Sequence, residues 1–356
     1  MRGIYLSRKP IAGSRYKYLQ MFSRVCDVSV SFRVSRERFL RYGFAIVKGD
    51  KCSDYKHALK ARIPYILLQH DTWTIRAGQE SADERAMIEG AASILFTSEE
   101  HVRWMSERYS LPEYRVVHLR PLAADLDFEP LPKLEGKHIV YAGGIATESM
   151  KDGMYGYRAY HDIFRTLIDA GWTVHVYPAW NTTDRTEGYE AIGCVVHEPV
   201  AQNALYRELS QYTVGFQGYA ETGPQCYVKG CRPNKLWEYL AAGIPTVGYN
   251  TGDGAAIYAG KWGTVARTLK SLPGAAERAS KMEIPDELRR AEIIDNDLAS
   301  FRDLVDIALS KCAPKGSVRL ARAVEYDGVR YPARSSIPRS LAYAMRDAGV
   351  IKGVGL

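Results

Sequence analysis

Residues 232–247 read RPNKLWEYLAAGIPTV. This stretch predicts a loop, a short helix beginning at Lys235, a turn at Gly243 and a buried strand from Pro245 onward. Lys235 and Glu238 stand at the start of that helix, where a lysine and a carboxylate can meet a bound nucleotide. The stretch therefore predicts one half of a nucleotide site inside an α/β domain.

Short apolar runs alternate with helical patterns over residues 1–125. The predicted strands are Gly3–Leu6, Val28–Ser31, Phe44–Val47, Tyr65–Gln69, Ile94–Thr97 and Val116–Leu119. The predicted helices between them are Asp54–Ala61, Ala82–Ala92 and Glu99–Tyr109, the last with Ser98 as its N-cap. Alternation of this kind predicts a parallel sheet covered by helices.

The acidic, Pro-rich segment 125–135 predicts a linker to a second α/β series. We therefore predict an N-terminal domain over 1–125 and a C-terminal domain over 136–312, with a basic extension over 313–356. Two doubly wound domains of this kind place their strand ends against a shared cleft. The strands and helices predicted for the second series are His138–Ala142, Tyr157–Ala170, Thr173–Tyr177, Cys194–His197, Gln202–Gln211, Thr213–Gln217, Lys235–Ala242, Pro245–Tyr249 and a closing helix Leu298–Lys311.

The letters at 235–247 resemble the donor-binding signature of GT-B glycosyltransferases of the family 4 type, which reads K-L-x-E-Y-x-A-A-G-x-P-V-V. The resemblance implies two Rossmann-like domains and transfer of a sugar from a nucleotide. It also implies that Glu238 accepts hydrogen bonds from both ribose hydroxyls, which suits a carboxylate. Arg232, Asn234 and Lys235 are implied to lie at the donor phosphates, where cations stabilise the leaving nucleotide.

Two further segments complete the donor side by resemblance. Gly143 and Gly144 follow the first strand of the second domain, and glycines let backbone N–H groups approach a phosphate or sugar. The segment around His197 resembles the loop that reads the nucleobase, and the family's general preference implies a UDP-sugar donor. Retaining members carry a second glutamate eight residues before Glu238, where this chain has Gly230. Retaining or inverting chemistry therefore stays open.

Three acidic or titratable residues are candidates for the chemistry itself. Glu221 follows a predicted strand and is a candidate for the sugar hydroxyls. His70 and Asp71 follow the apolar strand Tyr65–Gln69, and side chains just past a parallel strand face the cleft. Either one is a candidate base for the acceptor hydroxyl, with capping of the next helix as the alternative role. No metal constellation is visible, and the resemblance implies that no metal is needed.

The net charge of +7 is concentrated at the two ends of the chain. Residues 1–60 hold 14 Lys or Arg and four Asp or Glu, and residues 313–356 hold eight and three. Such ends favour an anionic partner. The favoured acceptor is a 5-hydroxymethylpyrimidine in duplex DNA, as in phage DNA glycosylation, with the base extruded. The proposed acceptor-side cations are Arg8, Lys9, Arg15, Arg33, Arg36, Arg38, Arg41, Lys48 and Lys51.

Two other functions remain open. One is transfer to a bacterial polysaccharide or lipid-linked glycan, with the basic domain docked on an anionic membrane. The other is a silent nucleotide-sugar binder, which the missing acid at Gly230 suggests. Within the extension, Asp327-Gly328 predicts a hairpin between Val318–Val324 and Val329–Tyr331, before a helix over Arg339–Ala348. No apolar run reaches about 18 residues and the six cysteines are scattered, so we expect a cytoplasmic protein.

Overall fold

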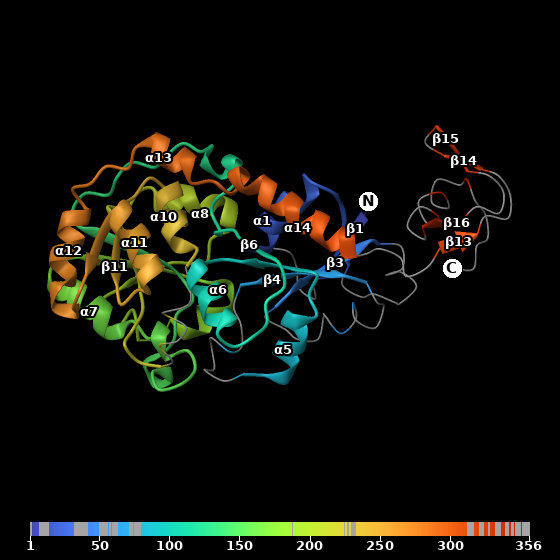
Figure 1. The fold of residues 1–356 in the computed structure, drawn as a ribbon. Coiled ribbons are helices and arrows are strands. Elements are labelled where there is room, and N and C mark those ends of the chain that lie inside the picture. Colours follow the sequence, from blue (N-terminus) through green and yellow to red (C-terminus); the bar gives the residue numbers. More distant parts are fainter. Residues whose placement is uncertain are drawn as a thin grey trace.

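Two parallel six-stranded sheets form the body of the molecule (Figure 1). Their strand orders are β2-β1-β3-β4-β5-β6 and β12-β11-β10-β7-β8-β9. Each sheet is wrapped by helices, as the alternating sequence pattern predicts. The computed structural model describes residues 2–6, 14–31, 42–49, 56, 58, 63–70, 74, 80–186, 188–223, 225, 228, 233–311, 317–319, 324–326, 328–331, 336–338, 342, 345 and 350.

The strands and helices of the two domains follow in chain order. The first sheet contains β1 (Arg2–Leu6), β2 (Asp27–Ser31), β3 (Phe44–Lys48), β4 (Tyr65–Gln69), β5 (Ser93–Phe96) and β6 (Tyr114–Val116). The second contains β7 (His138–Gly143), β8 (Thr173–Pro178), β9 (Val195–Val196), β10 (Val214–Gly218), β11 (Thr246–Tyr249) and β12 (Gly263–Ala266). The α-helices are α1 (Ser14–Ser23), α5 (Ala82–Glu89), α6 (Glu99–Ser106), α7 (His161–Asp169), α8 (Gln202–Leu209), α10 (Lys235–Ala241), α11 (Asp253–Lys261), α12 (Leu272–Ala279), α13 (Asp286–Ala291) and α14 (Leu298–Lys311).

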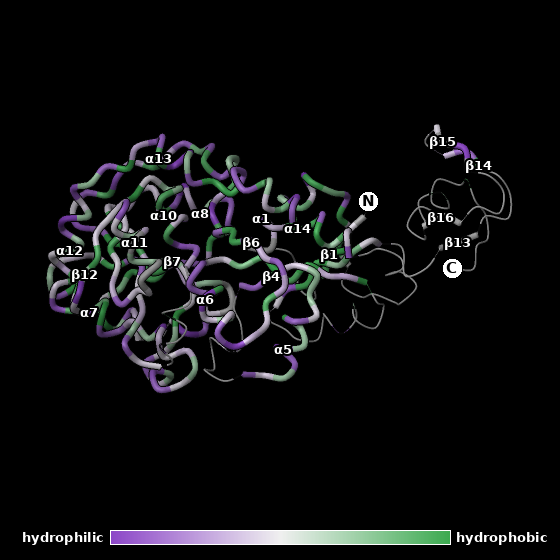
Figure 2. The backbone as a smooth tube through the Cα atoms, in the orientation of Figure 1, coloured by the Kyte–Doolittle hydropathy of each residue, from purple (hydrophilic) through white to green (hydrophobic). Residues whose placement is uncertain are grey.

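The first sheet is apolar on both faces, which is why helices cover both. Ile4 and Leu67 point to the face that α5 and α6 cover. Ile46 and Leu68 point to the opposite face, against α1. Figure 2 shows the hydrophilic residues along outer helices such as α13, which buries none of its residues.

Helix α14 packs on the first domain, whereas we expected it to close the second. Phe301, Leu304 and Ala308 recur at helical spacing and join the core of the first sheet beside α1. Ser93 Oγ donates to Leu304 O at 3.1 Å, and Lys311 Nζ donates to Ala92 O at 2.7 Å. Chain order alone predicts the wrong domain for this helix. Its apolar stripe packs on the part of the first sheet that α1 leaves uncovered.

Several predicted boundaries also shift. The strand expected at Val116–Leu119 is β6, which ends at Val116, and the helix expected from Tyr157 begins at His161 as α7. Helices α1, α11, α12 and α13 and strand β12 lie in segments without a predicted element. The helices expected at 54–61 and 339–348 fall largely outside the described residues.

The C-terminal extension forms two short antiparallel pairs, which Figure 1 shows to one side of the two sheets. Strands β14 (Val324–Tyr326) and β15 (Val329–Tyr331) make the predicted hairpin, with Gly328 at φ +72°. The strand expected over 318–324 is wrong, because β13 (Ser317–Arg319) pairs instead with β16 (Ser336–Pro338). In the part of the chain that the structure describes, no helix is long and apolar enough to cross a bilayer.

The centre of the second sheet depends on a glycine. A Cβ added at Gly215, in β10, would lie 2.3 Å from Cγ of the buried Tyr239 ring of α10. We expect Gly215→Ala to lower the free energy of unfolding by about 2 kcal/mol through overpacking. Chemical denaturation measures this, with Gly260→Ala in α11 as the control, where a Cβ meets no atom within 4 Å. Equal stability of the two variants would contradict the prediction.

Candidate functional site

Helix α10 divides the sequence motif into a buried part and a half-exposed part. Leu236, Trp237 and Tyr239 are fully buried, whereas Lys235 and Glu238 are half-buried at its first turn. The apolar side chains of the motif therefore anchor the helix in the core of the second domain. The lysine and the carboxylate remain available to a ligand.

The end of α10 is fixed by the predicted glycine. Gly243 has φ +70°, a conformation that L side chains rarely adopt. Its N–H donates to Leu240 O at 3.0 Å, and Ile244 N donates to Tyr239 O at 3.0 Å. This pair of bonds is a Schellman motif, which turns the chain into β11.

Lys235 reaches the glycine turn after β7. Gly143 has φ +147°, and a Cβ there would lie 3.3 Å from Lys235 Cε and 3.4 Å from its Nζ. The Lys235 ammonium is 4.9 Å from the centroid of the Tyr141 ring. The structure thus brings together two predicted donor-site features that are 92 positions apart in the chain.

Arg158 is a second cation at the same turn. A Cβ at Gly144 would lie 2.7 Å from Arg158 Nη1, so the absence of a side chain at Gly144 makes room for the guanidinium. Two basic side chains and an open backbone turn therefore converge at the carboxyl end of β7. This arrangement suits a phosphate group.

Glu238 contacts a residue that the sequence analysis did not single out. Gln202 Nε2 donates to Glu238 Oε1 at 3.3 Å and to Tyr206 Oη at 3.2 Å. Gln202 begins α8, directly after the predicted nucleobase loop. The candidate ribose carboxylate and that loop are therefore neighbours. Among the described residues, Asn234 does not cap α10 with its side chain, and its Oδ1 is buried without a hydrogen-bond partner.

His197 belongs to a chain of three histidines. His138 Nδ1 and His175 Nε2 are 2.9 Å apart, as are His175 Nδ1 and His197 Nε2. His138 Nε2 faces Glu135 O at 2.8 Å and must donate to it, so each ring donates from Nε2. Burial lowers the pKa of His175 to about 4, and it lowers the pKa of His197. The His197 ring also stacks on Tyr177, 4.3 Å between centroids, so this ring is held in place.

Glu221 lies in a loop that is tied to the β7 side of the site. Tyr249 Oη donates to Glu221 Oε1 at 2.6 Å, and the carboxylate is otherwise exposed. Ala220 N donates to Tyr157 O at 2.9 Å, and Thr222 Oγ1 donates to Gly156 O at 3.0 Å. The loop after β10 and the loop after β7 therefore form one unit, which contains both Glu221 and Arg158.

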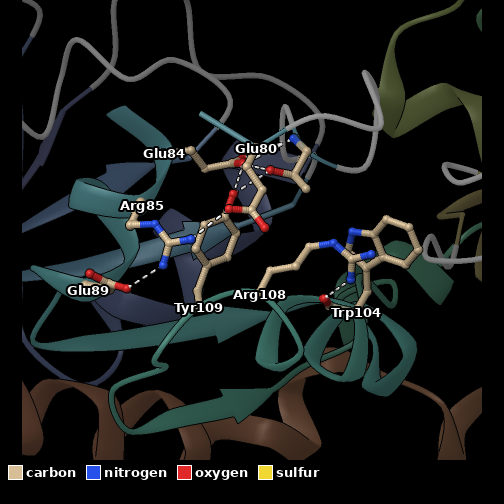
Figure 3. Close-up of polar contacts among 8 residues, drawn as sticks. Glu80, Glu84, Arg85, Glu89, Trp104, Arg108 and Tyr109 are labelled. Atoms are coloured by element: carbon tan, nitrogen blue, oxygen red, sulfur yellow. Dashed lines mark hydrogen bonds and ion pairs between the residues drawn. The ribbon is translucent and has the colours of Figure 1, made fainter. Parts of the chain in front are cut away.

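The first domain presents His70 at the end of β4. Asp71 lies outside the described residues, and the next described residue is Thr74. Thr74 N donates to the buried carboxylate of Glu84 at 3.1 Å, and Tyr109 Oη donates to it at 3.0 Å. Figure 3 shows this group beside α5, with Arg85 facing the carboxylates that flank it.

Aromatic side chains connect the two domains. Trp104 of α6 packs against Tyr157 and Tyr219 of the second domain. The Arg108 guanidinium lies 3.7 Å from the centroid of the Trp104 ring, as Figure 3 shows. His118 of the first domain stacks on Trp237 of α10 at 5.3 Å. Trp104 and His118 of the first domain therefore contact the second domain directly.

Most of the predicted acceptor-side cations lie outside the described residues. The side chain of Arg15 is not described, although its backbone belongs to α1, and Lys48 is half-buried in β3. Among the described residues, no group of three or more His, Cys, Asp or Glu side chains is arranged to hold a metal ion. The predicted residues that lie outside the described ranges are Arg8, Lys9, Arg33, Arg36, Arg38, Arg41, Lys51, Asp71, Gly230 and Arg232.

Sequence comparison finds no family model and no curated protein that matches this chain. Comparison of structures does find neighbours. A sucrose-phosphate synthase from Thermosynechococcus elongatus has a TM-score of 0.57 at 11% identity, covering 88% of this chain and 94% of its own. AviGT4, a glycosyltransferase of avilamycin A biosynthesis, has a TM-score of 0.56 at 12% identity, covering 87% and 98%.

The fold is GT-B. A third neighbour, trehalose-6-phosphate from E. coli bound with UDP-2-fluoro glucose, has a TM-score of 0.54 at 11% identity, covering 88% of this chain and 99% of its own. A GT-B fold places ligands at the carboxyl ends of its parallel strands. Lys235, Arg158 and the Gly143 turn lie at that edge of the second sheet.

Proposed function

We propose that this protein is a glycosyltransferase that uses a nucleotide-sugar donor, with UDP as its nucleotide. The observation that carries the proposal is the convergence of Lys235 and Arg158 on the Gly143–Gly144 turn. We place the donor diphosphate here, because an open turn with two cations at the carboxyl end of a parallel strand suits a phosphate group. The bound UDP-2-fluoro glucose named for the E. coli neighbour supports the choice of UDP.

The proposed reaction needs three tasks from these residues. The bond between the sugar carbon and the diphosphate oxygen breaks, and Lys235 and Arg158 stabilise the negative charge that develops on the leaving group. The acceptor hydroxyl oxygen forms the new bond to that carbon and gives its proton to a base, for which His70 and Asp71 are candidates. Glu238 holds the ribose, and Glu221 is the candidate for the sugar hydroxyls.

For the acceptor, we propose a hydroxyl on 5-hydroxymethylpyrimidine in duplex DNA. The support is the excess of Lys and Arg in residues 1–60 and 313–356. The half-buried ring of Trp104 is also compatible with a base or a sugar ring. A polysaccharide or lipid-linked glycan acceptor is the alternative, because such rings also stack on aromatic side chains.

Transfer assays test this function. With UDP-glucose, we expect label to enter duplex DNA that contains hydroxymethylated pyrimidines, and none to enter the same duplex without them. Binding should weaken about 10³-fold between roughly 50 and 200 mM salt if about six phosphates are contacted. Salt-insensitive binding and no transfer to DNA would refute the DNA acceptor. Absence of UDP binding would refute the nucleotide-sugar function itself.

A further inference from the structure

Lys17 is a buried lysine at the junction of the two domains. It lies on α1 of the first domain, next to Tyr16, which is 48% exposed, yet Lys17 itself is only 4% exposed. Its ammonium lies 5.6 Å from the centroid of the Tyr206 ring, which belongs to α8 of the second domain. A charge buried in this way is costly unless anions compensate for the lost hydration.

Two carboxylates supply that compensation. Burial lowers the pKa of Lys17, and the negative charges of Glu238 and Asp125 act against this lowering. Tyr206 hydrogen-bonds to Asp125, which lies in the 3₁₀ helix η1 (Ala123–Leu126) of the linker. Gln202 in turn donates to both Tyr206 and Glu238. These five residues form one connected group, which we call the Lys17 cluster.

The Lys17 cluster contains the carboxylate assigned above to the donor ribose. To accept two hydroxyl hydrogen bonds, Glu238 must be ionised and its oxygens must keep one orientation. Gln202 fixes one oxygen, while Lys17 supplies the positive charge from the other domain. Without Lys17, the cluster would hold two carboxylates and no cation to offset their mutual repulsion.

We propose that Lys17 is a positioning residue of the donor site, which holds Glu238 oriented for the ribose and so links donor binding to the N-terminal domain. The proposal rests on the function proposed above. The negative charges of Glu238 and Asp125 both act on Lys17 and on Tyr206, which belong to two neighbouring elements. Tyr239 and Lys235 belong to the same helix as Glu238. Arg289 of α13 donates to Ala241 O at the far end of that helix.

The test measures UDP binding by calorimetry at neutral pH. Lys17→Met should raise the Kd about 10-fold, because the Lys17 cluster then lacks the cation that holds the Glu238 carboxylate in place. Lys17→Arg, which keeps the positive charge, should restore most of the wild-type affinity. Lys56→Met, at an exposed lysine paired with Asp83, should match wild type.

Three outcomes would separate the proposals. If Lys17→Met lowers only the melting temperature and leaves the Kd unchanged, Lys17 is merely structural and the proposal is wrong. If Lys17→Met does not fold, Asp125→Asn replaces it: Glu238 then keeps the whole charge of Lys17, and the Kd for UDP must fall. An unchanged Kd there overturns the proposal. Failure of the wild-type protein to bind UDP would instead refute the proposed function.

Discussion

Glu238→Ala is expected to weaken binding of a UDP-sugar by at least about 100-fold. The variant removes the carboxylate that we assign to both ribose hydroxyls. Hydrogen bonds to a charged group contribute about 1.5–3 kcal/mol each, so the loss of two corresponds to about 3 kcal/mol or more. At 1.4 kcal/mol for each factor of ten, that is about two orders of magnitude in Kd. Isothermal titration with UDP-glucose measures it directly.

The control for this variant is a glutamate in an equivalent helical position. Glu287 lies in the first turn of α13, is exposed, and lies apart from the proposed site. Glu287→Ala should leave the Kd unchanged. Glu238→Ala also removes one of the two carboxylates that compensate for the buried charge of Lys17, so a thermal melt must show that the variant is folded at the temperature of the titration. Unchanged UDP binding in Glu238→Ala would remove the basis for assigning the donor site.

The sequence predicts the part of the site that one short segment encodes. The apolar residues of the segment from Lys235 to Gly243 define a buried face of α10, so their spacing places Lys235 and Glu238 on the remaining face. Gly243 then ends the helix by the predicted mechanism. These features are local, and local patterns are what a single sequence reveals.

Residues that reach the site through distant contacts were not predictable in the same way. Arg158 is placed by the pairing of two loops, through Ala220 N to Tyr157 O, which no periodicity signals. A count of charges includes Lys17 among the basic residues of the first 60 positions. Such a count cannot distinguish a buried cation from an exposed one, and Lys17 is buried. Helix α14 was assigned to the wrong domain for a related reason: its apolar stripe shows that it packs, but not on which sheet.

Lys235→Met is expected to lower kcat about 10²- to 10³-fold, with a smaller change in the KM for the donor. The ammonium lies at the Gly143 turn, where we place the donor diphosphate. Negative charge on that diphosphate increases as the sugar leaves, so a cation there stabilises the transition state more than the bound donor. Removal of one such preorganised group costs about this factor. Initial rates at varied UDP-sugar concentrations separate kcat from KM.

A variant on the other side of the contact between Lys235 and Gly143 checks that the loss of kcat arises at this turn. Gly143→Ala keeps Lys235 but adds a methyl group 3.3 Å from Lys235 Cε and from Tyr141 Oη, at a backbone φ of +147° that alanine rarely adopts. It should lower kcat as well, because the ammonium and the turn must both move. Lys270→Met, at an exposed lysine of the same domain, should behave as wild type. If Lys235→Met raises KM but spares kcat, the lysine binds donor and transition state equally, and its assignment to the leaving group is wrong.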